Sequence, residues 1–537
     1  MALPRFINTD VLASVLVTLV IYLAYKLFES WFRDYCSPLQ HLPGPPSPGY
    51  VLGNIQESMT EDNARLHDNW KQEYGPTMRY NGPFNANWLY TSDVKALQHV
   101  MSNVDDWPKP EYIHYMLSQL AGPGILVVSG PENRKQRRVM NPAFGTSQLR
   151  EMTSVFVAKS IHLRDNLARV AFETDAGSPI DVLPWVSRMT LDIIGLAGFG
   201  YDFGASNAEA PQNELTKGLD AVFRSKPSIF SFLKGMFPSL RILPFGNSGA
   251  LRQVQTGLFA IGRQLIASAK KSVNEGAVDD SNNLISLLIR SNTVKDLPLS
   301  QRLSDEDVLA PEIPTLLIAG HETSSSAITW SFYALCAHPE SQTKLRNELL
   351  TLDTDTPTMD QLNSLPYLEI FVRETLRIFA PVQTVPRVAA KDDILPLDCP
   401  VTDKKGITYR SLRIVKGQGI MIPVVGLNTD KSIWGEDAAD FKPERWENLP
   451  ETVRNIPGVW ANTMSFLGGP RSCIGFRFSI IEMKAALFSV VRAFELELAV
   501  PVDCITKRTE ILQHPMLKTD PEKGAQLPLL IRPYVSH

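Results

Sequence analysis

The stretch SFLGGPRSCIGFRFS, residues 465–479, sets one cysteine in a glycine-rich turn directly before a helical pattern. The letters GGP favour a tight turn ahead of Cys473, and Gly475 permits close approach of another group just after it. Backbone N–H groups at a helix start and the cation of Arg471 both favour thiolate over thiol. A single buried cysteine is more often an inert core residue, but glycine on both sides of Cys473 indicates room for a large flat partner.

The chain of 537 residues is longer than one hydrophobic core usually grows, and no low-complexity linker divides its middle. Two lobes packed as one catalytic unit are therefore expected. With 44% hydrophobic and 20% charged residues, the chain can bury a large core. A formal net charge of -4 lacks the basic surplus of a nucleic-acid-binding protein, so we expect no nucleic acid partner.

The five cysteines are widely spaced and form no CxxC pair, which favours a reducing compartment over a disulfide framework or a zinc site. The chain also contains no N-x-[ST] glycosylation sequon. This absence fits a body that stays outside the secretory lumen, although chance accounts for it as well.

The N-terminal region has the composition of a membrane anchor. Residues 11–28, VLASVLVTLVIYLAYKLF, carry Lys26 as their only charge and predict one membrane-spanning helix. A cleaved signal peptide is the competing interpretation, but the letters that follow offer no small-x-small cleavage site, and Trp31 and Phe32 suit a membrane interface. The predicted organisation is a short segment at 1–10, the anchor at 11–28, a linker with a stiff proline-rich hinge at 29–49, and a catalytic domain at 50–537.

Beyond residue 50 the pattern is mainly helical. Residues 149–173 and 251–273 repeat apolar side chains every three or four positions, which predicts helices with one buried face. Short strand-like pieces, TMRYNG, NWLYTS and GQGIMIPVVG, are few and well separated. The sequence therefore predicts a mainly α protein with small β-sheets, an α+β class with a large helical lobe.

One helical segment, residues 305–339, carries an unusual polar cluster. Pro311 and Pro314 are expected to disturb its first turns, and an apolar run then leads into Gly320, His321 and Glu322. A glycine inside a helix costs roughly 1 kcal/mol relative to alanine. A compensating function is therefore expected at this cluster.

Four motifs, in this order along the chain, resemble those of the cytochrome P450 superfamily of haem-thiolate monooxygenases. They are AGHET at 319–323, the pair Glu374 and Arg377, FKPERW at 441–446, and the cysteine signature formed by Phe466, Gly469, Arg471, Cys473 and Gly475. The resemblance implies the cytochrome P450 fold, in which a smaller β-rich lobe joins the helical lobe, together with the N-terminal transmembrane helix. It also implies that Cys473 is the axial thiolate ligand of the iron of haem b, which favours O–O cleavage.

On the face opposite the cysteine, the resemblance places Ala319 and Gly320 beside bound oxygen. Glu322 and Thr323 become the pair that delivers protons to dioxygen as it is reduced. A threonine whose hydroxyl bonds back to its own helix is the alternative interpretation of Thr323. Because relatives that rearrange peroxides often lack this threonine, its presence favours oxygen activation.

The resemblance also assigns charged side chains. Haem carries two propionates, and Arg137, Arg387 and Arg471 occupy the positions that match their partners. One departure is Asn133, which stands where the family usually has tryptophan or histidine. The resemblance makes a structural network of Glu374, Arg377 and Arg445, with surface ion pairing as the alternative.

Partners and substrate follow from the same assignment. The basic cluster Arg134, Lys135, Arg137 and Arg138 is expected to dock an NADPH-dependent flavoprotein reductase, although a solvated helix face is the alternative for Arg134 and Lys135. Apolar stretches predict a lipophilic substrate that enters from membrane lipid; they are residues 112–125, residues 227–237, Leu316 with Ala319, residues 382–385, and Ile511 with Leu512.

The sequence therefore predicts a membrane-anchored monooxygenase that inserts one atom of O₂ into a lipophilic molecule. By resemblance to fungal microsomal members, it is placed on the endoplasmic reticulum with a cytoplasmic catalytic domain and a terpenoid or other secondary metabolite as substrate. A peroxide isomerase of the same fold and a haem protein that only carries electrons or senses ligands are the rival functions.

Overall fold

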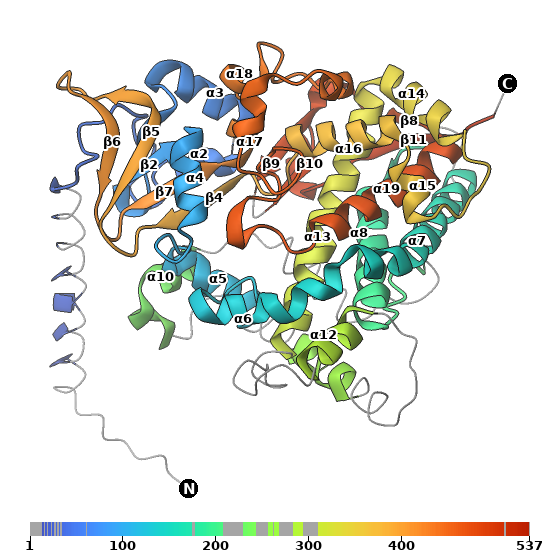
Figure 1. Ribbon diagram of the computed structural model, residues 1–537, viewed down its shortest axis with the longest axis horizontal. Helices are drawn as coiled ribbons and strands as arrows, with labels where there is room; N and C mark the ends of the chain where they lie inside the picture. Colours follow the sequence, from blue (N-terminus) through green and yellow to red (C-terminus); the bar gives the residue numbers. More distant parts are fainter. Residues whose placement is uncertain are drawn as a thin grey trace, which may run out of the picture.

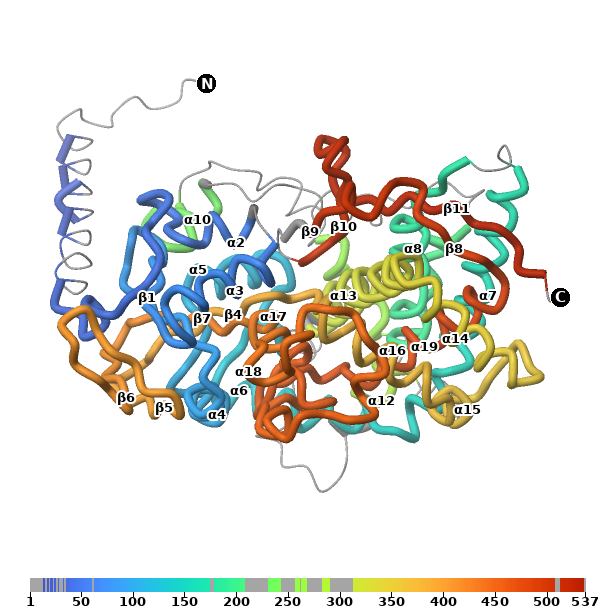
Figure 2. The backbone as a smooth tube through the Cα atoms, turned by 90° about the horizontal axis from the view of Figure 1, so that it is seen from above, coloured from blue at the N-terminus to red at the C-terminus, as the bar shows by residue number. Residues whose placement is uncertain are grey.

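The computed structural model describes residues 35–60, 62–173, 178–207, 229–242, 256–260, 262–267, 283–293, 310–509 and 512–535, together with scattered positions between 13 and 32. Two of the small sheets lie at one end of the molecule, and the long helices lie at the other end beside a further small sheet (Figure 1). Seen from above, β1, β5 and β6 again lie at one end, and α7, α14 and α15 at the other (Figure 2). The predicted division into a helical lobe and a smaller β-rich lobe is confirmed.

The β-rich lobe is built on a four-stranded sheet in the order β1-β2-β7-β4, with bounds Thr77–Asn81, Asn87–Thr91, Gly419–Pro423 and Thr384–Val388. The three strand-like pieces read from the sequence supply β1, β2 and β7, so segments more than 300 residues apart pair in one sheet, where Leu89 lies opposite Ile420. A second sheet is the hairpin of β5 (Asp393–Thr402) and β6 (Thr408–Ile414). The short helices of this lobe are α2 (Ile55–Thr60), α3 (Asn63–Tyr74), α4 (Val94–Ser102), α17 (Val424–Asn428) and α18 (Lys431–Trp434).

The helical lobe surrounds α13 (Ala310–Ala337), which contacts α5, α8, α14, α16 and α19. This helix continues through Pro311 and Pro314, so the two prolines mark its first turns without ending it. The helices of this lobe are α5 (Glu111–Ala121), α6 (Gly130–Met140), α7 (Thr146–Glu173), α8 (Leu183–Ile193), α10 (Ile229–Met236), α12 (Leu284–Thr293), α14 (Pro339–Leu349), α15 (Met359–Asn363), α16 (Pro366–Ile378) and α19 (Phe476–Ala493). Two further sheets border it: β3-β11-β8 (Ile180–Asp181, Pro528–Pro533, Phe494–Leu498) and β10-β9 (Gln513–Leu517, Ile505–Thr509).

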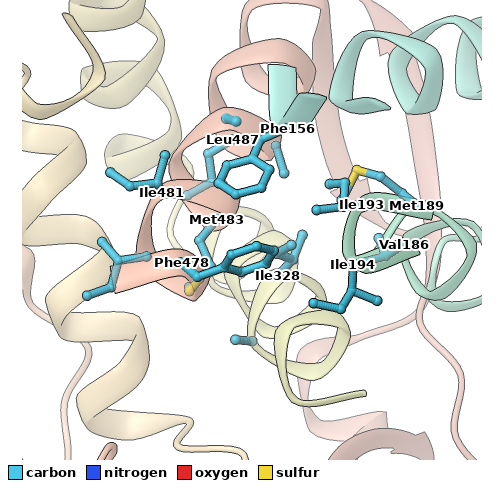
Figure 3. Packing of buried hydrophobic residues seen from close by; sticks show 14 of the residues in the cluster. Phe156, Val186, Met189, Ile193, Ile194, Ile328, Phe478, Ile481, Met483 and Leu487 are labelled. Atoms are coloured by element: carbon cyan, nitrogen blue, oxygen red, sulfur yellow. The ribbon is translucent and has the colours of Figure 1, made fainter. Parts of the chain in front are cut away.

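Each lobe has its own buried apolar cluster. In the helical lobe, the ring of Phe156 from α7 meets that of Phe478 from α19 edge to face, with centroids 4.6 Å apart. Figure 3 shows these rings beside Ile328 of α13 and Met189 of α8. The segment 149–173 forms most of α7 as predicted; of the segment 251–273, the described residues 256–260 and 262–267 are helical.

The structure describes ten of the 18 positions of the predicted anchor at 11–28. The described positions within it are helical, and their apolar side chains, such as Ile21 and Phe28, are exposed. Among the residues that are described, no helix has the length and apolar character needed to cross a bilayer.

The proline-rich segment before the catalytic domain packs against the β-rich lobe. Pro43 accepts a hydrogen bond from the backbone of Arg79 at 2.8 Å, and Leu39 and Leu42 are buried. This stretch forms neither helix nor strand, as its prolines predict. These contacts fix the direction in which the chain enters the catalytic domain.

Candidate active site

Cys473 lies between η9 (Gly469–Arg471) and α19. Its backbone N–H donates to the carbonyl of Phe466 at 2.9 Å, which closes the loop. Gly469 has φ +66°, and a Cβ there would lie 2.3 Å from the carbonyl oxygen of Met101, so only glycine fits. These constraints fix the cysteine at the start of α19.

The side chain of Cys473 is exposed although protein atoms surround it closely, so the thiol borders an open space inside the molecule. Burial raises the pKa of this thiol, while the backbone N–H of Gly475 and the charge of Arg137 lower it. A Cβ on Gly475 would meet only Phe144, at 3.7 Å. Within the described part of the chain, the space beside Gly475 is therefore unfilled.

A second open surface lies on α13. Ala319, Gly320 and Thr323 are half-buried, whereas residues 316–318 and 324–332 of the same helix are buried. Ala319 and Thr323 are one turn apart and share a helix face. The hydroxyl of Thr323 donates to the carbonyl of Ala319 at 2.6 Å, which is the back-bonded arrangement that formed the alternative interpretation of this residue.

The two open surfaces belong to helices that pack on each other. The hydroxyls of Ser324 in α13 and Ser479 in α19 lie 3.3 Å apart. Ser324 follows Thr323 directly, and Ser479 lies six residues after Cys473. The contact therefore brings the AGHET segment and the cysteine loop, about 150 residues apart in sequence, to one site.

Glu322 lies near two histidine side chains. The residue is 8% exposed, and its carboxylate lies 3.5 Å from Nδ1 of His321 and 3.9 Å from Nε2 of His514. Nε2 of His321 lies 2.9 Å from the hydroxyl of Ser187. Sequence reasoning missed His514, although its position two residues after the predicted substrate contact Leu512 was an available signal.

Gly320 allows close helix packing. A Cβ built on it would lie 3.1 Å from Cδ1 of Ile194, in η3 (Ile194–Gly198). The missing side chain thus lets α13 approach its neighbour. The expected role of Gly320 in admitting oxygen stays a prediction, because the direction of the absent side chain leads to Ile194.

Four cations lie close enough together to interact electrostatically, and two of them bond to the loop that precedes α6. The predicted Arg137, Arg387 and Arg471 are joined by Lys109, and none of the four has an acidic partner within ion-pair distance in the described part of the chain. Burial first, and then the charges of the three arginines, lower the pKa of Lys109 to about 7; burial and Arg471 lower that of Arg387 to about 10. Sequence reasoning missed Lys109, although its position between Pro108 and Pro110 was a signal of an extended, restricted backbone.

These cations use part of their donor capacity on backbone carbonyls. Arg471 donates to Val128 at 2.6 Å, Lys109 to Leu126 at 2.8 Å, and Arg137 to Ser472 in the cysteine loop. The buried Nε of Arg137 has no hydrogen-bond partner. Such an unsatisfied donor among unpaired cations favours an anionic ligand.

The neighbours of Arg137 on α6 divide into buried and exposed residues. Asn133 is buried and donates through Nδ2 to the carbonyl of Ile125 at 2.9 Å. Arg134 is exposed and pairs with Asp105, Arg138 is exposed, and Lys135 is half-buried. The predicted basic cluster therefore lies partly on the surface, where Arg134 pairs with Asp105.

The predicted Glu374, Arg377 and Arg445 form one ion-pair network. Glu374 and Arg377 are fully buried and bond at 2.7 and 2.8 Å, and Nε of Arg445 lies 3.2 Å from Glu374. The alternative of surface ion pairing is therefore wrong. Arg377 also donates to the carbonyl of Asn428 at 2.8 Å, and Asn428 donates to the hydroxyl of Ser465, which begins the cysteine segment.

The predicted substrate contacts form a wall of helices and strands. Residues 112–125 form most of α5 and the loop after it, and the ring of Tyr112 packs on Phe232 of α10 with centroids 5.4 Å apart. Leu316 is buried, residues 382, 384 and 385 are half-buried, and Leu512 is half-buried. Ile511 and residues 227–228 lie outside the described residues.

The donor set fits a haem. A lone thiol faces an open space, the glycine after it leaves room for a flat ring, and four cations without acidic partners suit two carboxylates. The part of the chain that the structure describes contains no cluster of three or more side chains able to ligate a metal ion. A single thiolate on an iron that the cofactor itself coordinates matches this arrangement.

Comparison with known proteins agrees with this site. The family model of cytochrome P450 matches residues 43–519. Cytochrome P450 monooxygenases 205 and 128 of Postia placenta are 45% and 44% identical, over 98% and 96% of this chain and 98% and 97% of their own. Ganoderic acid synthetase CYP5150L8 of Ganoderma lucidum is 32% identical over 90% of this chain and 93% of its own. The chain therefore belongs to the cytochrome P450 family, whose members bind haem, and it is an oxidoreductase of the monooxygenase type.

Proposed function

We propose that the protein is a haem b monooxygenase that uses O₂ to oxidise a lipophilic substrate, with Cys473 as the axial ligand. The observation that carries the proposal is the pair of open surfaces, at Cys473 and along Ala319 to Thr323, on two helices that pack together. Arg137 lies near Cys473, and it has no acidic partner among the described residues. When bound, the haem supplies the oxygen-activating chemistry of a thiolate-ligated iron. The remaining work falls to side chains of this chain.

The cations hold the cofactor by its carboxylates. Arg137, Arg387, Arg471 and Lys109 provide forked or point charges where the described residues offer no acidic partner. The backbone N–H of Gly475 stabilises the thiolate, and Arg137 adds a positive charge beside it. Phe466 holds the loop from the other end through its carbonyl.

Thr323 and Glu322 are the proposed proton-handling residues. Glu322 is buried against His321 and His514, which lets it exchange protons within a connected set of titratable groups. The hydroxyl of Thr323 turns away from the carbonyl of Ala319 when it passes a proton toward the substrate side. Because a hydroxyl both donates and accepts, Thr323 can relay a proton without changing its charge.

Glu374, Arg377 and Arg445 act as positioning residues. Arg377 reaches Asn428, whose side chain contacts both Ser465 and the backbone of Met464. The network therefore holds the start of the cysteine segment. Its action on the chemistry is indirect, through the place of the thiolate.

Substrate, partner and location extend the proposal. A terpenoid or other secondary metabolite fits the apolar lining and the kinship with a relative named ganoderic acid synthetase. Electrons come from NADPH through a flavoprotein reductase that docks on the exposed basic residues of α6. Residues 11–28 anchor the protein to the endoplasmic reticulum as a single pass, with the catalytic domain in the cytoplasm.

The test compares the wild type with Cys473→Ser and with Cys504→Ser, a half-buried cysteine of β9's leading turn that serves as control. The wild type and Cys504→Ser are expected to give the red-shifted ferrous–CO band of thiolate ligation, and Cys473→Ser is expected to lose it. Metabolite profiling of an expressing host, with and without O₂, separates the rivals. Product without O₂ indicates a peroxide isomerase, and NADPH consumption without any product indicates an electron carrier or sensor.

A further inference from the structure

The loop between α5 and α6, residues 122–129, is held by side chains from four parts of the chain. Its carbonyls accept from Asn133, Lys109 and Arg471, while its Ile125 N–H donates to Glu312. Loops usually satisfy their backbone with water. Here one loop is fixed by buried or half-buried side chains of α6, α13, the cysteine segment and the stretch before α5.

Glu312 is the least expected of these partners. It is fully buried, and its two oxygens accept from the single N–H of Ile125 at 3.0 and 3.2 Å. No cation pairs with it among the described residues, and burial raises its pKa to about 8. A carboxyl group buried in this way is costly, so its contact with Ile125 is the feature that accounts for its position.

Asn133 bonds to the other backbone group of Ile125, its carbonyl. Its Nδ2 donates to the carbonyl of Ile125 at 2.9 Å, so both backbone groups of Ile125 are bonded to buried side chains of two different helices. Asn133 is the departure from the family pattern noted in the sequence. In this chain the side chain at that position donates to the loop.

The clamped loop borders the open face of α13. Glu312, Ala319 and Thr323 are seven and four residues apart, a spacing that places them on one side of the helix. At 1.5 Å per residue, Glu312 lies about 10 Å along the axis from Ala319. Ile125 therefore lies over the same side of α13 as the half-buried residues of the active site.

We propose that Glu312 and Asn133 are positioning residues that clamp the backbone of Ile125 and so fix the wall of the substrate chamber, determining which ligand shapes enter. This inference deepens the proposed function and rests on it for the identity of the chamber. The clamp acts through Ile125, not by contact with the reacting atoms. Through the position of Ile125, it tunes selectivity for bulky molecules.

The test uses purified ferric holoprotein carrying Glu312→Ala, Glu312→Gln or Asn133→Leu. Asp192→Asn is the matched control, because Asp192 is also fully buried and accepts from two loop amides, of Ala205 and Ser206, at 2.8 and 2.9 Å. Hydrogen exchange of peptides covering residues 122–128 reports the clamp. Spectral titration with imidazole and with the bulky azole clotrimazole reports the chamber.

Glu312→Ala is expected to speed exchange in this loop by about tenfold or more, the effect of a lost hydrogen bond. It is also expected to change the ratio of the two Kd values by about fivefold or more, which corresponds to about 1 kcal/mol. Asn133→Leu shifts both readouts in the same direction, and Glu312→Gln, which keeps an acceptor oxygen, restores most of the wild-type behaviour. The control Asp192→Asn alters stability without altering the Kd ratio.

Two results would overturn the inference. Unchanged exchange at 122–128 in both Glu312→Ala and Asn133→Leu refutes the clamp, and faster exchange with an unchanged Kd ratio refutes its role in the chamber. If Glu312→Ala does not fold, the other two variants decide the question. Failure of the proposed function looks different, because the wild type itself would then lack haem and azole binding while its loop exchange remained measurable.

Discussion

Removing the carboxylate of Glu374 is the sharpest test of how the cysteine loop is held. Its two oxygens accept five hydrogen bonds, from Nε and Nη2 of Arg377, Nε of Arg445, the backbone of Lys442 and the indole of Trp446, at distances between 2.7 and 3.2 Å. Glu374→Ala leaves two buried guanidinium groups without their shared anion. Breaking a buried pair by removing one partner costs about 3–5 kcal/mol.

The matched control is Glu173→Gln, which breaks the exposed pair with Arg169 one turn away on α7. Exposed pairs of this kind contribute about 0.3–0.5 kcal/mol. Pulse proteolysis across a urea series gives the folded fraction of each holoprotein, and the ferrous–CO spectrum of the same samples reports thiolate ligation. We expect Glu374→Ala to lose about 3 kcal/mol or more and most of the thiolate band, and Glu173→Gln to lose neither.

Two outcomes would refute the reasoning. A loss below about 1 kcal/mol in Glu374→Ala would mean that the buried charges find other partners, contrary to the packing around Arg377. A large loss of stability with a fully retained thiolate band would mean that the network does not act on the cysteine loop through Asn428 and Ser465. The free energy of unfolding therefore tests how strongly the network is held, and the ferrous–CO spectrum tests whether it acts on the cysteine loop.

Three further predictions concern single side chains. Lys109→Ala removes one of four clustered cations and should speed haem loss to excess apomyoglobin by about tenfold or more, which is the effect of one charge-assisted hydrogen bond. The exposed control Lys95→Ala should leave the rate of haem loss unchanged, and equal rates in the two variants would refute a role for Lys109. Burial raises the pKa of Glu482 from 4.5 to about 8, so the folded chain holds this proton more tightly than the unfolded chain does. The free energy of unfolding therefore falls as pH rises from 4.5 through 8, by up to on the order of 5 kcal/mol from this group. Glu482→Gln should flatten that decline in urea unfolding at a series of pH values, and an unchanged slope would contradict the raised pKa of Glu482. Thr323→Ala should keep NADPH consumption but lower the product formed per NADPH by about tenfold or more. The control Ser331→Ala removes another back-bonded hydroxyl of α13 and should change neither quantity, so a matching loss in both variants would show a general effect on the helix.

Much of the site could be predicted because its chemistry depends on local sequence. The glycines around Cys473 and the short spacing from Glu374 to Arg377 are requirements of a turn and of one helix face, and both are readable without coordinates. The helical pattern of 149–173 and the three strand-like pieces were equally local and proved correct. The depth at which Glu374 and Arg377 are buried was not readable, since spacing on one helix says nothing of what covers it.

Sequence by itself determined the family, the class of fold and the cysteine that we propose as the iron ligand, because turns, helix faces and motif order are properties of the chain alone. Only the tertiary structure decided that Lys109 joins the three arginines and that His514 lies beside Glu322. It also decided that Ile194 fills the space at Gly320, and that Asn133 and Glu312 bond to the backbone of Ile125. Each of these depends on which distant segments meet. That choice follows from how side chains from the whole chain pack together, and no local pattern encodes it.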